Sequence, residues 1–143
     1  MRHVANQEGG YSNNRHDKGG LTYAGISTIF YKSLVRSYGY RNVPVTLLTE
    51  KERRHIYYKH FWVASGADRI KDPALALQVF DHAVNASVRV SNALLKKGNT
   101  TPRMYRNARK TYYVQRKQCP TFCNGWLART ERIYKIGIEL KGA

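Results

Sequence analysis

Carboxylates are scarce in this chain of 143 residues, which holds 9 Asp and Glu against 25 Lys and Arg, a formal net charge of +16. A charge of this size predicts attraction to polyanions. Nucleic acids are one such partner, and the anionic polymers or lipopolysaccharide of a bacterial envelope are another. Charge alone does not choose between them, but the shortage of carboxylates allows each one to be considered in turn.

Long hydrophobic runs, cysteine and proline are also in short supply. No apolar run is long enough to span a bilayer, and no apolar segment follows the amino terminus as it does in a secretory signal. The only cysteines are Cys119 and Cys123, and without a second pair or a histidine cluster they do not predict a zinc site. We expect two free thiols near a helix end, with a local disulfide formed after export as the alternative. No metal or cofactor is expected.

Helix start and stop signals recur along the chain and predict a mainly α fold. Ser27 and Gly39 bracket one expected helix, Thr49 opens a capping box with Glu52, and Asp72 precedes a proline that suits a first helical turn. An apolar stripe then continues to Leu95, which predicts one long helix. The expected helices cover about 2–8, 28–38, 50–66, 73–97, 102–118 and 124–139.

The amino-terminal part differs from the rest because residues 9–26 are polar and rich in glycine. Such a segment predicts a loop or a short hairpin. A natural joint lies in the polar stretch 65–72. We therefore expect two parts, residues 1–68 and residues 69–143, packed as one compact unit.

Six of the nine carboxylates have an ordinary structural explanation in helix first turns, caps, linkers or exposed ion pairs: Glu50, Glu52, Asp68, Asp72, Glu131 and Glu139. Asp81 lies one helical turn before Asn85, so the two side chains share a face. One interpretation is a buried polar pair that satisfies backbone groups or an arginine. The other is a wall of a substrate cleft.

Glu8 and Asp17 remain, and their settings differ in a way that suits glycoside cleavage. That reaction needs a protonated acid on the leaving oxygen, and usually a carboxylate that activates water or stabilises the cationic sugar. The acid keeps its proton in an apolar setting, whereas a wet loop keeps a carboxylate ionised. Glu8 at a helix end and Asp17 in a polar loop meet these demands. The plainer interpretation of Glu8 is a surface glutamate near a flexible terminus.

Motifs in both halves resemble the family 108 glycoside hydrolases, N-acetylmuramidases that include phage endolysins and secretion-activator proteins. The first half contains Glu8-Gly9-Gly10-Tyr11, Asp17-x-Gly19-Gly20-x-Thr22-x-x-Gly25-Ile26 and Tyr57-Tyr58-x-x-Phe61-Trp62. The second half is similar to the family's C-terminal peptidoglycan-binding region in Phe80-Asp81-x-Ala83-Val84-Asn85, Arg109-x-x-Tyr112-Tyr113 and Phe122-x-x-Gly125-Trp126-Leu127-x-Arg129. The chain departs from the family in having fewer residues before Glu8, and in Ser87, where glycine is usual.

The resemblance implies a lysozyme-like helical domain with a short irregular or hairpin segment near the amino terminus. It implies that Glu8 is the general acid, and a similarity to the Glu/Asp/Thr triad of phage-type lysozymes makes Asp17 and Thr22 catalytic candidates. Tyr11 and Tyr23 are expected to stack on sugar rings, because aromatic faces suit pyranoses. Asp81 and Asn85 are the further substrate-binding candidates.

The expected activity is hydrolysis of the β-1,4 bond between N-acetylmuramic acid and N-acetylglucosamine. The partners would be peptidoglycan glycan strands and anionic envelope polymers or lipopolysaccharide, with no nucleic acid, and the protein would be a monomer. We expect synthesis in a host bacterial cytoplasm without a signal peptide, and action on the wall after holin-type release. The alternatives are a basic, non-enzymatic binder of nucleic acid, and a wall-binding protein whose catalysis is weak or lost.

Overall fold

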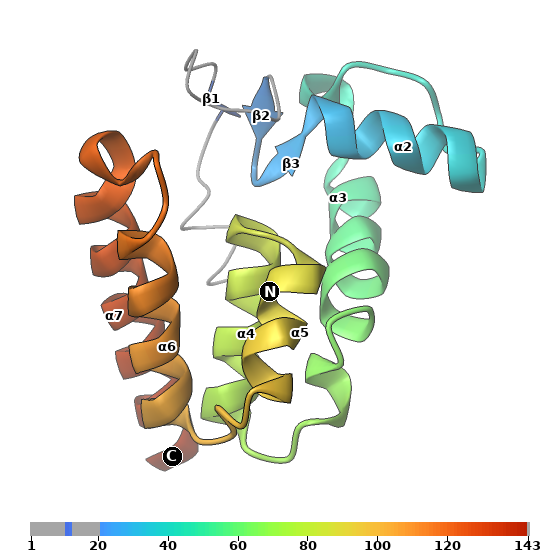
Figure 1. Ribbon diagram of the computed structural model, residues 1–143. Coiled ribbons are helices and arrows are strands. Elements are labelled where there is room, and N and C mark those ends of the chain that lie inside the picture. The colour runs from blue at the N-terminus through green and yellow to red at the C-terminus, as the bar shows by residue number, and fades with distance from the viewer. Residues whose placement is uncertain (1–10, 13–20, 143) are drawn as a thin grey trace. The chain divides into compact units, whose positions relative to one another are not determined.

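The computed structural model of the chain describes residues 11–12 and 21–142, with side chains for the latter range (Figure 1). The chain folds into two compact units, Met1–Tyr58 and Lys59–Ala143. The boundary predicted from composition lay after residue 68, within the second of these units. Which function belongs to which part stays a prediction.

The first unit is built on a small antiparallel sheet that leads directly into a helix (Figure 1). The strands are β1 (Tyr11–Ser12), β2 (Thr22–Tyr23) and β3 (Ile26–Ser27), in the order β1-β2-β3. Ala24 and Gly25 connect β2 to β3 with φ angles of 51° and 82°, as a two-residue type I′ hairpin turn requires. The hairpin expected within residues 9–26 is therefore present.

Two helices and two short helical turns complete this unit and the joint that follows. They are α2 (Thr28–Tyr38), η1 (Val45–Leu47), α3 (Glu50–Tyr57) and the π-helical turn η2 (Tyr58–Val63), which continues α3. Ser27 caps α2 by accepting a hydrogen bond from the Phe30 amide, and Gly39 closes it in the left-handed conformation. The predicted bounds of α2 are confirmed because both signals are local in sequence.

The predicted capping box of α3 is also present. The Thr49 hydroxyl accepts from the Glu52 amide, and the Glu52 carboxylate accepts from the Thr49 amide. Glu52 forms an ion pair with Arg41 at 2.8 Å. The Arg41 hydrogen bond is the largest cause that lowers the pKa of Glu52 to about 2. The two acidic residues at the start of α3 therefore have structural roles, as expected.

The second unit is a helical bundle around α4. Its elements are η3 (Ala67–Arg69), α4 (Pro73–Asn85), α5 (Val88–Lys96), α6 (Pro102–Val114) and α7 (Cys119–Gly142). Every residue of α4 from Ala74 to Val84 is buried, because α5, α6 and α7 all contact it, and α6 and α7 lie side by side (Figure 1). A Cβ built on Gly137 would lie 3.0 Å from the Ala74 Cα, so glycine allows α7 to approach α4 closely.

The single long helix predicted over 73–97 is wrong, because the chain forms α4 and α5 instead. Ser87 is extended, with φ of −171° and ψ of 161°, and its hydroxyl accepts from the Val90 amide as an N-cap. The apolar stripe continues across the break since both helices bury a face. A polar N-cap residue inside an apolar pattern was the available signal.

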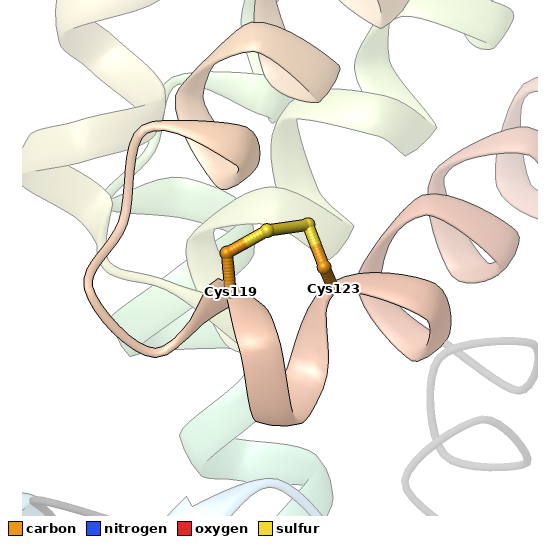
Figure 2. Close-up of a disulfide and its surroundings, with 2 residues drawn as sticks. All are labelled: Cys119 and Cys123. Atoms are coloured by element: carbon orange, nitrogen blue, oxygen red, sulfur yellow. A yellow bond between two sulfur atoms is a disulfide. The ribbon is translucent and has the colours of Figure 1, made fainter.

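The expected pair of free thiols is also wrong. Cys119 and Cys123 form a disulfide, with 4.3 Å between their Cα atoms (Figure 2). Residues four apart lie on one helical face, and α7 begins at Cys119 rather than near residue 124. Pro120 fits this first turn because its missing amide hydrogen has no helical acceptor there.

Among residues 21–142, no helix combines the length and the apolar character that a membrane crossing demands.

Candidate active site at the hairpin

Three of the candidates from the first half of the chain, Tyr11, Thr22 and Tyr23, lie on strands β1 and β2. Glu8 and Asp17 lie outside the described residues; in the sequence, Glu8 precedes β1 and Asp17 falls in the connection between β1 and β2. Thr22 and Tyr23 form β2, and the Tyr11 backbone of β1 pairs with Tyr23. The structure therefore puts Tyr11, Thr22 and Tyr23 on adjacent strands.

Hydrogen bonds from other parts of the unit hold strand β2 at both of its ends. At its start, the amide and the hydroxyl of Thr28 both donate to the Leu21 carbonyl, at 2.9 Å and 2.7 Å. At its end, the hydroxyl of Tyr57 donates to the Ala24 carbonyl. Tyr57 is buried, so this contact joins the turn after Tyr23 to the packed side of α3.

Arg53 joins the same helix to the hairpin one turn earlier. Its Cζ atom lies 5.6 Å from the centre of the Tyr23 ring, and its Nη1 donates to the Leu48 carbonyl at 2.5 Å. A guanidinium this close to an aromatic ring is attracted to the ring's quadrupole. Arg53 did not stand out in the sequence, since only the fold brings α3 to β2.

Asp81 and Asn85 lie in the second unit, where Asp81 is fully buried between two arginines. Arg109 Nη2 approaches Asp81 Oδ2 at 2.7 Å. Arg129 binds the same carboxylate with Nη2 at 2.8 Å and Nε at 3.0 Å. A carboxylate with no exposed surface and these partners has no oxygen for a ligand, which supports the interpretation as a buried polar pair rather than a cleft wall.

Asn85 extends the same network, because its Oδ1 accepts from the Tyr113 hydroxyl. The Tyr113 oxygen in turn accepts from Arg109 Nε at 3.1 Å. Burial raises the pKa of Tyr113, which keeps its hydroxyl protonated as a donor. Asn85 is only half-buried, but its Oδ1 atom is directed to Tyr113 within the bundle.

Buried charge sets the protonation states in this network. Burial opposes ionisation of Asp81, but Arg109 and Arg129 together hold its pKa below the ordinary value. Burial, followed by the positive charge of Arg109, lowers the pKa of His82 well below its usual range. His82 is therefore neutral, and its Nδ1 lies 2.7 Å from the Tyr105 hydroxyl. These groups stabilise the bundle instead of forming an open site.

A surface pocket opens where α6 turns into α7. It is lined by Val114, Arg116, Lys117, Cys119, Pro120, Thr121, Cys123 and Asn124. Its lining contains two cations and no carboxylate, so it favours anions. Among residues 21–142, no group of three or more His, Cys, Asp or Glu side chains has the arrangement of a metal site.

Comparison with known proteins adds a family and a fold. The family model for glycosyl hydrolase 108 matches residues 1–86. The structure is similar to that of Brucella abortus SagA, with a TM-score of 0.82 and 21% identity over 99% of this chain and 92% of that one. At this identity the likeness shows the fold alone, and it confirms the mainly α, lysozyme-like architecture. A search of curated proteins gave no match.

Proposed function

The chain belongs to glycosyl hydrolase family 108, and from this premise we propose that it is a peptidoglycan hydrolase that acts as an N-acetylmuramidase. The bond cleaved is the β-1,4 linkage between N-acetylmuramic acid and N-acetylglucosamine. The observation that carries the proposal is that the family match covers the whole hairpin region, including Glu8, Asp17 and Thr22. In this proposal the catalytic groups are side chains of the protein, and water is the second reactant.

Glu8 is the general acid in this proposal. Its proton passes to the bridging oxygen as the bond from that oxygen to C1 of muramic acid breaks, and a water molecule supplies the new oxygen at C1 and the proton that restores the acid. Asp17, with Thr22, orients the water or stabilises the positive charge at C1. Tyr11 and Tyr23 provide ring faces for the sugars.

Anchoring of the hairpin supports these roles. Catalytic groups act only when they are held in a defined geometry, and β2 is fixed by Thr28 at one end and by Tyr57 at the other. A rigid β2 keeps Thr22 and Tyr23 in one position relative to the substrate. A hairpin without such contacts would be a poor support for an acid and a carboxylate.

The second unit, in our proposal, binds the wall. Its pocket beside Arg116 and Lys117 suits anionic groups, and peptidoglycan strands, envelope polymers and lipopolysaccharide all carry them. The disulfide suits action outside the reducing cytoplasm, which fits an endolysin-type enzyme made in a host cell and released to the periplasm through a holin. We expect the enzyme to act as a monomer.

Wall clearing by purified protein tests the catalytic assignment. Glu8→Gln replaces the proton-donating carboxyl group by an amide of similar size, so we expect lysis to fall by about 100-fold or more. Glu50→Gln is the matched control, because Glu50 is exposed and pairs with Arg54 on α3. Lysis by Glu8→Gln at the wild-type rate would overturn the assignment.

The alternative function is a basic binder of cell wall or nucleic acid without catalysis. The net charge of +16 and the mixture of arginine and tyrosine on α6 favour it. Such a protein would bind DNA with a steep dependence on salt concentration. It would leave wall suspensions turbid under conditions where it binds them.

A further inference from the structure

Arg53 carries a charge beside the hairpin that no carboxylate of residues 21–142 neutralises. The other arginines near it on α3 and in the preceding loop have acidic partners, since Arg54 pairs with Glu50 and Arg41 pairs with Glu52, both at 2.8 Å. Among the described residues, no carboxylate forms an ion pair with Arg53. Its hydrogen bond goes to a backbone carbonyl, that of Leu48, which leaves the net charge in place.

The position of this charge is fixed. Leu48 is buried, so its carbonyl is a rigid acceptor, and the centre of the Tyr23 ring lies 5.6 Å from Arg53 Cζ. Arg53 is itself only half-buried. A guanidinium has five N–H donors, and the hydrogen bond to the Leu48 carbonyl uses a single donor of Nη1. Nε and Nη2 thus have no acceptor among the described residues.

A half-buried arginine held in this way is suited to a carboxylate ligand. The planar fork of N–H groups matches a carboxylate with two hydrogen bonds, and pre-positioning reduces the loss of side-chain entropy. In peptidoglycan, N-acetylglucosamine has no ionisable group. N-acetylmuramic acid differs by its lactyl ether, which ends in a carboxylate when free and leads to the carboxylates of the stem peptide when substituted.

We propose that Arg53 binds a carboxylate of the muramic acid lactyl group or its stem peptide, and thereby directs the muramyl sugar to Tyr23. Arg53 is then a specificity residue. This inference rests on the proposed function, because it takes the hairpin as the place where the glycan is cleaved. It gives a reason for the charge beside Tyr23 that packing alone does not supply.

Binding measurements with Glu8→Gln test the inference without hydrolysis. Three soluble glycans are compared: strands with stem peptides, strands freed of peptide with an open lactyl carboxylate, and N-acetylglucosamine oligomers of matched length. A protein with Arg53 in this role binds at least one kind of carboxylate-bearing strand about tenfold more tightly than the oligomers. The kind of strand that is preferred shows whether Arg53 binds the carboxylate of the lactyl group or a carboxylate of the stem peptide.

Three substitutions then assign the preference to this side chain. Arg53→Met is expected to abolish it by weakening binding of the preferred strand about tenfold while leaving the oligomers unchanged. Arg53→Lys keeps the charge but not the fork, so part of the preference returns. Arg54→Met, which removes the neighbouring exposed arginine, is expected to change neither the binding of the preferred strand nor that of the oligomers.

Several results would overturn the inference. One is equal binding of all three glycans by the Glu8→Gln protein with Arg53 intact. This result does not depend on whether any Arg53 variant folds. Another is an equal loss on all three glycans in Arg53→Met, as a general loss of structure would produce. Absence of hydrolysis by the wild-type enzyme would instead refute the proposed function, because the binding comparison uses a protein without the catalytic acid.

Discussion

The hydroxyl of Tyr57 donates a hydrogen bond to the backbone carbonyl of Ala24, and so joins the end of α3 to the turn after β2. Tyr57 is buried, whereas its neighbour Tyr58 is exposed. The sequence contains the two tyrosines side by side in one motif, but only the structure shows that the first of them supports the hairpin.

Removing this hydroxyl is expected to loosen the hairpin. Tyr57→Phe leaves the Ala24 carbonyl without this donor and should lower the free energy of unfolding by about 1–2 kcal/mol. Hydrolysis should fall more through kcat than through KM, because positioning of Thr22 and Tyr23 is what changes. Tyr58→Phe is the control and should alter neither quantity. Equal effects of the two substitutions, measured by urea unfolding and steady-state kinetics, would contradict this role.

The pairing of Asp81 with two arginines predicts a large effect on the second unit. Arg129→Met removes one of the two arginines that bind the buried Asp81 carboxylate and leaves Arg109 to compensate its charge, so we expect a loss of about 1–3 kcal/mol. Thermal or urea unfolding measures this loss. Arg103→Met changes an exposed arginine at the start of α6 and should have little effect. A loss below about 1 kcal/mol in Arg129→Met would mean that the pair is not buried as described.

Neutral His82 predicts a pH dependence of stability. The folded protein holds the pKa of His82 well below 6.5, so the unfolded chain binds the additional proton as the pH falls below 6.5. Stability is therefore full above that pH and decreases by up to about 1.4 kcal/mol per pH unit beneath it. His82→Gln should flatten the dependence between pH 6.5 and the onset of carboxylate protonation.

The charged and titratable groups that face His82 come from three helices. They are Asp81 from α4, Arg109, Tyr105, Tyr112 and Tyr113 from α6, and Arg129 from α7. Asp81, whose pKa is lowered, contributes stability that is lost only at still lower pH. An unchanged slope in His82→Gln, measured by urea unfolding across pH 5–7 in steps of about 0.5, would assign the dependence to other groups.

The disulfide predicts sensitivity to a dithiol reductant. Reduction adds two electrons and two protons and opens the link between Cys119 and Cys123. For so short a loop the chain-entropy estimate is a loss of about 2 kcal/mol, seen as a lower Tm. The double substitution Cys119→Ser with Cys123→Ser should start at the lower Tm and show no response. A wild-type Tm that is the same with and without reductant would contradict this contribution.

Much of the fold follows from local sequence signals. The start and end of α2 were predicted from Ser27 and Gly39, and the starts of α3 and α4 from Thr49 and Asp72, since a cap acts within one helical turn. The break at Ser87 was missed because the apolar stripe continued through it. The true start of α7 was missed because the preceding helix was expected to continue to residue 118, whereas α6 ends at Val114 and α7 begins at Cys119.

The site was predictable only in part. Thr22 was identified by resemblance and Tyr23 as an aromatic residue suited to stack on a sugar, and the structure adds the contacts that hold β2. Arg53 was missed because its contact with Tyr23 joins segments far apart in the sequence. Asp81 was assigned two interpretations, and its arginine partners, from α6 and α7, support the structural one. Long-range partners of this kind depend on the packing of whole helices.

Mass spectrometry of digested peptidoglycan tests the central claim most directly. A muramidase releases fragments whose new reducing end is N-acetylmuramic acid, and Glu8→Gln prepared in parallel should release almost none. Fragments with N-acetylglucosamine at the new reducing end would contradict the bond assignment. Intact strands after incubation with the folded wild-type protein would contradict the hydrolase itself.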